Sequence, residues 1–337
     1  MAGWMPAPPL PDHFDWIKLS SGEWLKGELV SFYDDTMNFD SDILGLLTID
    51  AEDIQELRSH NRKSLRFNDG SVLEGQIYIK GEFISLIGAG MRLYQRDQLV
   101  SIAHSQANGE RELWSGKVSL SANLRRGNTE QDDYMAEFET FRRTASNRLN
   151  IKYLAALTTN DGKETGNNQR LTSQYDIFFS QNTFFRPLAF EAFRDPFQNI
   201  SYRITYSVGA GYTLINSDDS HWDISAGLGF QTTRFETVEA GEDRQKQTPV
   251  IEFGTGYDYE ISDNLDFHFS YAGQRVNASS GLYNHHIETG IDIDLISDIE
   301  FEITFIWDRV AKPTKDSEGI TPDNDDVRLV FGLGYSF

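Results

Sequence analysis

The last stretch of the chain, DDVRLVFGLGYSF (residues 325–337), alternates between bulky apolar side chains and small or polar ones. A period of two is typical of a β-strand whose two faces meet different environments. Here the larger side chains share the apolar face. This arrangement is typical of a strand in a membrane β-barrel, with lipid on the bulky side and a wet lumen on the other. The apolar face consists of Leu329, Phe331, Leu333, Tyr335 and Phe337.

Two interpretations of this stretch are open at this point. It could be the edge strand of a soluble β-domain, but such a strand turns its bulk inward and is usually followed by turn residues. The other interpretation is a closing barrel strand with an aromatic end. That end, formed by Phe331, Leu333, Tyr335 and Phe337, is similar to the signal read by the machinery that assembles outer-membrane barrels. We therefore expect the assembly machinery to be a partner of this strand.

The composition indicates one large β-domain and a smaller one. The 337 residues include 27 glycines and no cysteine, so we expect no disulfide and no thiolate metal site. A net charge of −22 would repel nucleic-acid phosphates, which excludes that class of partner. No apolar run approaches the about 20 residues of a membrane helix. The opening MAGWMPAPPLP has no basic region and no apolar core of a signal peptide, and we expect that an export signal has been removed.

A short pattern in the first third of the chain occurs twice. LSSGEWLKG (residues 19–27) and FNDGSVLEG (residues 67–75) share the spacing G-x-x-L-x-G, and each stands between two strand-like runs. Glycine at the turn would supply the positive φ of a tight hairpin. Each copy is too short for a large core of its own. We therefore predict a duplicated module of two small SH3-like or Sm-like barrels packed on each other.

This module is predicted over residues 14–108, after an extended proline-rich leader at residues 1–13. Two roles are open for it: a docking module for a periplasmic protein partner, or a cap that only stabilises the rest of the chain. An SH3-like shape does not decide between them.

From residue 109 to residue 337 the sequence predicts an all-β, transmembrane, up-and-down antiparallel β-barrel. About twelve alternating segments follow one another, each near the ~10 residues that cross a bilayer. Longer connections such as TTNDGKETGNNQ (158–169) and AKPTKDSEGITPDNDD (311–326) alternate with shorter ones such as SQNT (180–183). Outer-membrane barrels have long outer loops and short periplasmic turns. An even strand number would then place the preceding module in the periplasm.

At this point the chain resembles a known family, described as salt-induced outer-membrane proteins and defined by a domain of unknown function. The resemblance lies in the L-x-x-G-x-x-L-x-G opening, in WSGKVSLSANLRRGNTEQDDY (114–134), in the strand from Arg203 to Tyr212, and in the terminal GLGYSF. It implies a Gram-negative outer-membrane β-barrel surrounded by outer-membrane lipid. It implies no catalytic residue.

Strand parity predicts an acidic lumen. Carboxylates of inward parity outnumber the inward cations, among them Lys117, Arg125, Lys152 and Arg170. Negative side chains that line a pore favour cations, so the leading hypothesis is a passive or gated channel for small, preferably cationic solutes. The candidate pore-lining residues are Glu137, Glu139, Asp176, Glu191, Arg203, Asp223, Glu252, Asp258, Asp266, His268, Glu288, Asp292, Glu302, Asp308 and Arg328.

Two other function classes remain open. Small barrels are often filled by side chains, so the chain could be a structural or receptor barrel without transport. His268 and Ser270, beside Asp266, have the spacing seen in outer-membrane lipid hydrolases. Those enzymes work at the lipid face, whereas parity points these side chains inward, and no G-x-S-x-G motif occurs. We therefore expect no enzymatic activity.

No cofactor or metal is expected either. His285 and His286 point to opposite faces of one strand, so they cannot bind one metal together. The acidic stretches 34–42 and 323–326 lack the spacing of an EF-hand and are interpreted as solvated loops.

Overall fold

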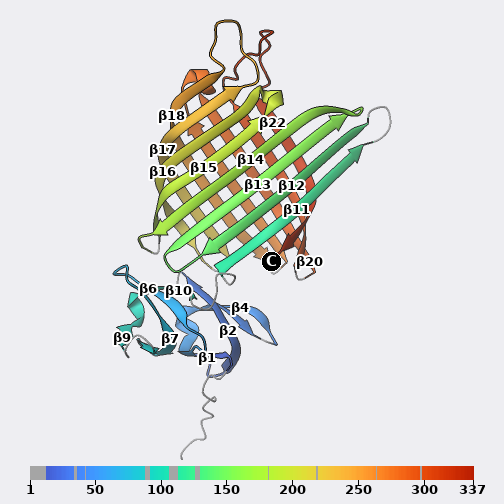
Figure 1. Cartoon of the computed structure of the whole chain (residues 1–337). Helices are drawn as coiled ribbons and strands as arrows, with labels where there is room; N and C mark the ends of the chain where they lie inside the picture. The colour runs from blue at the N-terminus through green and yellow to red at the C-terminus, as the bar shows by residue number, and fades with distance from the viewer. Residues whose placement is uncertain are drawn as a thin grey trace, which may run out of the picture. The chain divides into compact units, whose positions relative to one another are not determined.

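The computed structural model describes residues 13–33, 36–41, 43–87, 92–105, 113–125, 130–180, 182–217, 219–262, 264–296 and 298–337. The chain forms two compact units, an N-terminal module and a C-terminal barrel, and each is described by itself (Figure 1). The leader expected at residues 1–13 lies outside the described residues except for His13, as do residues 34, 35 and 42 of one acidic stretch. The solvated loop expected over the rest of that stretch is wrong, because Thr36–Ser41 form a strand that buries Met37 and Phe39. No helix in the described part of the chain is long and apolar enough to cross a membrane.

The N-terminal module is a 10-stranded antiparallel sheet that curls into a ring. Its ring follows the order β1, β5, β7, β6, β10, β2, and β1 pairs with β2 to close it. Strands β3 and β4 continue outward from β2, and β8 and β9 continue from β7. The strands are β1 (Asp15–Leu19), β2 (Trp24–Tyr33), β3 (Thr36–Ser41), β4 (Gly45–Asp50), β5 (Ile54–Arg58), β6 (Lys63–Phe67), β7 (Val72–Lys80), β8 (Phe83–Ile87), β9 (Arg92–Gln95) and β10 (Leu99–His104).

The two sequence repeats exchange neighbours in this ring. Strand β5 pairs with β1 of its own repeat and with β7 of the other, while β10 pairs with β6 of its own repeat and with β2 of the other. The predicted duplication is confirmed, but the expectation of two separate barrels is wrong. The physical reason is burial, because one apolar cluster takes Ile17 and Leu29 from the first repeat and Leu65 and Ile77 from the second.

The two glycines of the repeated motif meet different needs. Gly22 and Gly70 stand at the hairpin turns with φ of 106° and 82°, as predicted. Gly27 and Gly75 lie inside strands, where another strand comes very close. A Cβ on Gly27 would be 2.0 Å from the backbone oxygen of Asp40, and one on Gly75 would be 2.8 Å from a backbone oxygen of β8. The second glycine is therefore required by close approach of strands.

Replacing Gly27 by alanine tests this close approach. We expect Gly27→Ala to destabilise the module by about 1–3 kcal/mol, because β3 must move away from β2. Hydrogen exchange of the full-length chain would show this as faster exchange in β2 and β3. The exposed Glu52→Ala variant is the control and should leave exchange unchanged. Unchanged exchange in Gly27→Ala would contradict the explanation.

The C-terminal unit is a closed barrel of strands β11 to β22, each hydrogen-bonded to the next and β22 to β11 (Figure 1). The prediction of about twelve up-and-down strands is confirmed. The strands are β11 (Trp114–Arg125), β12 (Gln131–Arg143), β13 (Asn147–Asn160), β14 (Lys163–Phe178), β15 (Thr183–Asp195), β16 (Ile200–Asn216), β17 (Ser220–Phe235), β18 (Gln245–Ser262), β19 (Leu265–Arg275), β20 (Tyr283–Ile296), β21 (Ile299–Val310) and β22 (Asp325–Ser336).

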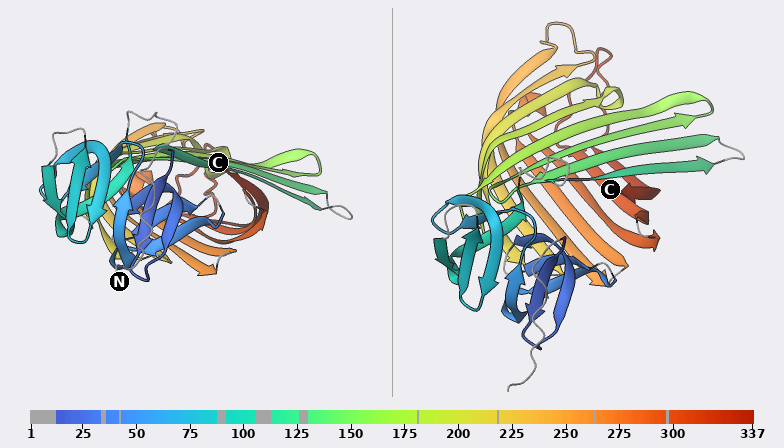
Figure 2. Two further views of the ribbon diagram at one scale, coloured as in Figure 1. Left: turned by 90° about the horizontal axis from the view of Figure 1, so that it is seen from below. Right: turned by 60° about the horizontal axis from the view of Figure 1, so that its bottom comes forward.

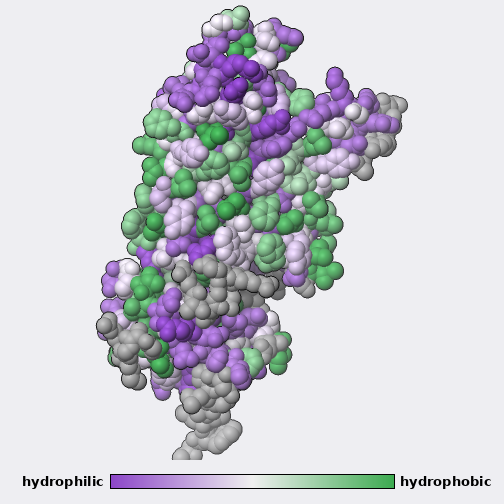
Figure 3. All heavy atoms as spheres, in the orientation of Figure 1, coloured by the Kyte–Doolittle hydropathy of each residue, from purple (hydrophilic) through white to green (hydrophobic). Residues whose placement is uncertain are grey.

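The outer face of the barrel is apolar, as the terminal strand predicted. Leu329, Phe331 and Leu333 of β22 expose 58%, 50% and 55% of their surface, whereas Gly332 and Gly334 between them are buried. Figure 3 shows apolar side chains across the middle of the barrel wall and hydrophilic side chains gathered at one end. An apolar band outside a polar interior is the arrangement of a transmembrane β-barrel.

The connections are sorted between the two ends of the barrel, with one correction. The longest, 236–244, 276–282 and 311–324, all lie at one end, opposite the end that holds short turns such as 144–146. The predicted long loop at 158–169 is wrong. Strands β13 and β14 run on through it and meet at Asp161 and Gly162, whose φ values are 50° and 74°. Asp-Gly with two positive φ values forms the tight hairpin turn that suits twisted strands.

Candidate functional site: the barrel lumen

The lumen holds the predicted candidates in several ionic clusters. Lys117 of β11 lies among three carboxylates of β20 and β21, with Nζ 3.1 Å from Asp292, 3.1 Å from Glu300 and 2.6 Å from Glu302. These carboxylates are close enough together to hold a cation. The lysine ammonium already occupies that position, and His268 Nδ1 lies 3.4 Å from Asp292. We therefore assign no metal ion to this cluster.

Lys152 joins two walls of the barrel. Its Nζ lies 2.8 Å from Glu137 on the neighbouring β12 and 2.6 Å from Glu288 on β20. Strands β13 and β20 are nearly opposite each other in the ring. Glu288 is buried, so this contact spans the interior and leaves little water around it.

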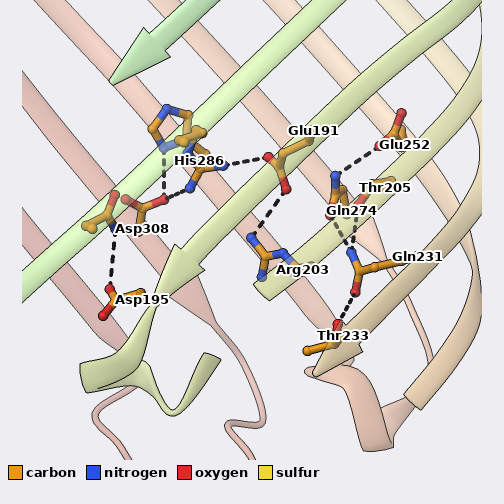
Figure 4. A network of polar contacts seen from close by, with 12 residues as sticks. Glu191, Asp195, Arg203, Thr205, Gln231, Thr233, Glu252, Gln274, His286 and Asp308 are labelled. Atoms are coloured by element: carbon orange, nitrogen blue, oxygen red, sulfur yellow. Dashed lines mark hydrogen bonds and ion pairs between the residues drawn. The ribbon is translucent and has the colours of Figure 1, made fainter. Parts of the chain in front are cut away.

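Arg170 of β14 makes a second contact of this kind. Its guanidinium lies 2.6 Å from Glu191 of β15 and 2.5 Å from Asp308 of β21, which is again nearly opposite in the ring. Figure 4 shows the network, in which His286 Nδ1 lies 2.9 Å from Asp308 and Arg203 lies 3.5 Å from Glu191. The lumen is therefore bridged at two levels by direct ion pairs.

Two buried phenylalanines support the arginines. Phe193 contacts both Arg170 and Arg203, whose guanidinium carbons are 4.6 Å and 4.5 Å from the ring centroid. Phe184 is similarly placed 4.8 Å from Arg148. A cation over an aromatic face is stabilised further when water is excluded. The aromatic rings thus fill the interior and hold the guanidinium groups in place.

Two further cations face the lumen and are absent from the candidates that parity predicted. Arg148 lies 2.8 Å from Asp176 and 2.6 Å from Asp223, and Arg186 lies 2.6 Å from Asp176. Arg148 directly precedes the alternating segment that begins at Leu149, and it has the same parity as Lys152. Extending that parity to the start of the strand would have found it.

Arg186 was missed because the parity of β15 changes within the strand. Uniform alternation counted back from Glu191 would put Phe185 and Pro187 on the inner face, but the structure turns Phe184 and Arg186 inward instead. The ladder with β16 shifts register just after Arg186. Proline has no N–H to donate and is tolerated in a sheet at such bulges. The irregular pattern of FFRP was the only signal of this shift.

A neutral polar cluster lies towards the end with the long connections (Figure 4). Gln231 donates to Thr205 at 3.2 Å and to Gln274 at 2.9 Å, and Gln274 donates to Glu252 at 2.9 Å. Gln231 is completely buried. These hydrogen bonds fill the lumen beside the Arg203–Glu191 ion pair, since Arg203 and Thr233 are directly opposite each other on β16 and β17.

The remaining candidates occupy more open positions. Glu139 accepts a hydrogen bond from Asn150 at 2.9 Å, and Arg328 is bonded to Asp326. Asp258 and Asp266 are exposed near the short-turn end. The carboxylate excess predicted for the lumen therefore lies mainly at this mouth, while the deeper carboxylates are paired.

Removing a bridging cation should weaken the barrel. We expect Arg170→Gln to cost about 3–5 kcal/mol of unfolding free energy, because the buried Asp308 and the partly buried Glu191 both lose their contact with Arg170. Arg309→Gln breaks an exposed pair with Asp325 at 2.6 Å and should cost at most about 1 kcal/mol. Urea unfolding from lipid vesicles would measure both. Equal effects of the two variants would contradict a bridging role for Arg170.

The fold and the lumen define a transmembrane β-barrel whose interior is largely occupied by its own side chains. A family model matches residues 118–337, and the chain therefore belongs to the protein family of unknown function DUF481. No curated protein matches the chain.

Several solved structures are similar to it at low identity. The β-domain of a Bordetella autotransporter shows 11% identity and a TM-score of 0.32, covering 66% of this chain and 97% of that one. An autotransporter translocator domain from Neisseria meningitidis shows 10% and 0.37, covering 66% and 88%. An outer-membrane channel from Pseudomonas putida shows 10% and 0.35, covering 66% and 95%. Likeness at this level carries no information about activity.

Proposed function

We propose that this protein is an outer-membrane barrel with a filled lumen, acting as a structural or receptor barrel and not as an open pore. The contacts of Lys152 with Glu288 and of Arg170 with Asp308 carry this proposal. They join strands that are nearly opposite in the ring, so a solute moving along the axis would have to break them. Each break would leave buried charges without partners, which is costly.

A second candidate is a gated passage for small cations. The carboxylates of the lumen favour this candidate. They outnumber the lysines and arginines there, so a net negative charge remains after the ion pairs are counted. If the bridges open, the negative groups left in the lumen would attract cations and repel anions. The two candidates differ in whether the bridges ever break in the membrane.

Planar-bilayer recording tests the closed lumen. We expect the wild-type protein to show no conductance steps. The double variant Lys152→Gln/Arg170→Gln should open cation-preferring steps, because it removes both bridges and keeps the carboxylates. Arg309→Gln, outside the lumen, should behave like the wild type. Steady conductance of the wild-type protein would overturn the filled-lumen proposal and support the passage.

The location proposed for the barrel is the bacterial outer membrane, with the long connections outside. The sorting of connections supports this orientation. Strand β11 begins at the short-turn end, so the module that precedes it would lie in the periplasm, where a protein partner could dock. The exposed terminal face of β22 would be read by the assembly machinery. The absence of enzymatic activity stays a prediction.

Because the chain has no cysteine, single introduced cysteines can report the orientation. We expect Ser317→Cys, in the longest connection, to react with a membrane-impermeant maleimide on intact cells. Asp298→Cys, in a short turn, should react only after the outer membrane is permeabilised. The reverse pattern would place the module outside the cell and contradict the proposed location.

A further inference from the structure

The hydrogen-bonded seam that closes the barrel ends part-way along its two strands. Strands β11 and β22 pair as far as Ser121 and Gly332. Both strands continue, and the next rungs in the same register would join Ala122 to Phe331 and Asn123 to Val330. The described residues show no pairing there. Figure 2 shows β11–β14 standing away from β20–β22 at the end opposite the short turns.

An unpaired edge at this position is unusual in a membrane. Leu329 and Phe331 lie within the unpaired stretch of β22 and expose 58% and 50% of their surface on the outer face. They mark this stretch as lipid-facing. Lipid-exposed sheet edges are not tolerated in hydrocarbon, because each unsatisfied backbone group costs several kcal/mol. The seam must therefore either close further or be covered at times by something else.

The lumen behind the unpaired seam is apolar. Met135 of β12, Leu154 of β13 and Ile306 of β21 form a buried cluster, and Ala156 and Val330 pack against it. Val330 is the first inward side chain beyond the last rung of the seam. Most other inward side chains described for the barrel are polar or charged. The interior is thus apolar where the wall is unpaired.

A cavity of about 570 Å³ lies beside this cluster. Its lining comes from β11–β14 and lies mostly on the outer face of the wall, where Leu120, Tyr134, Leu157, three alanines, Asn167 and Gln169 have outward parity. The inward residues Ser121, Met135 and Ala156 contribute only from between these positions on the same strands. The volume falls in the range of about 300–1,000 Å³ found for small-molecule sites. A hollow on the lipid side of β11–β14 and the apolar cluster on the lumen side therefore lie on opposite faces of the same part of the wall.

We propose that the seam beyond Ser121 and Gly332 is a lateral opening that receives a single acyl chain from the surrounding lipid. The acyl chain would lie on Met135, Leu154 and Ile306. Lipid is the occupant favoured by the site, since it already surrounds this wall and the cluster offers no charge to pair with. Because ion pairs span the lumen, an acyl chain would reach this cluster through the barrel wall and not along the barrel axis. This inference rests on the proposed membrane location and goes beyond it.

Paired cysteines can lock the seam in the full-length protein, which has no cysteine of its own. Gly116 and Phe337 exchange both backbone hydrogen bonds, so rungs 121/332 and 123/330 are non-hydrogen-bonded. Such rungs bring Cα atoms to about 4.5 Å, which suits a disulfide. Asn123→Cys/Val330→Cys would lock the unpaired seam. Ser121→Cys/Gly332→Cys, on the last paired rung, is the matched control.

The probe is palmitic acid with a photoreactive diazirine, in phospholipid vesicles that carry the inserted protein. We expect it to label peptides of Met135 and Ile306 in the reduced Asn123→Cys/Val330→Cys variant and to lose this labelling on oxidation. The oxidised control should keep it. Labelling of Leu228, which faces lipid on β17 with 63% exposure, confirms insertion in every sample.

Two results would overturn the proposal. One is labelling confined to outward residues such as Leu228 in all samples. The other is lumen labelling that survives the locked seam. Failure of labelling at Leu228 would instead contradict the membrane location, so the two failures are distinguishable. Oxidation of the 123/330 pair as fast as the 121/332 pair, with or without the fatty acid, would also count against an opening.

Discussion

The short ladder between β11 and β22 is the constraint on which the barrel depends. Without it the other strands form an open sheet with two unpaired edges, which hydrocarbon does not tolerate. In the sequence, this ladder is visible only as two alternating segments, one at each end of the barrel unit. Gly332 and Gly334 fit it closely, since a Cβ on Gly332 would come within 2.5 Å of Ser121 Oγ and one on Gly334 within 2.5 Å of a Glu302 oxygen. Small residues on the inner face of β22 thus leave room for the first ionic cluster.

Local patterns predicted what depends on local geometry. The alternation of β22 fixed which side chains face out, and the repeated glycine spacing located both hairpins of the module. Features that depend on which strands pair with each other were not predictable from the sequence. The exchange of neighbours between the two repeats joins β5 to β7 and β10 to β2, and no local signal distinguishes this from two separate barrels. The bulge after Arg186 changed which side chains of β15 enter the lumen, and the irregular tetrapeptide FFRP was its only sign in the sequence.

The candidate site shows the same division. Parity placed the carboxylates on the inner face, but it could not say which of them meet a cation. The contact between Lys152 and Glu288 joins residues 136 positions apart, and that between Arg170 and Asp308 joins residues 138 apart. Charge counting alone suggested a negative pore. Buried charges must be paired, however, and the pairs that form across the interior convert an acidic lining into a set of bridges.

The polarity of each part of the lumen depends on whether water, protein or lipid lies next to it. At the short-turn mouth the acidic groups are exposed, so water can solvate Asp258 and Asp266 without partners. Deeper in, water is scarce, and carboxylates such as Glu288 and Asp308 are held by cations, while Glu252 is held by hydrogen bonds from Ser207 and Gln274. Where the seam is unpaired, lipid and not water lies next to the interior. Ion pairs there would be exposed to hydrocarbon, which is costly for charged groups. The apolar side chains of Met135, Leu154 and Ile306 can contact hydrocarbon without that cost. The apolar cluster is therefore the interior that an incompletely closed wall requires.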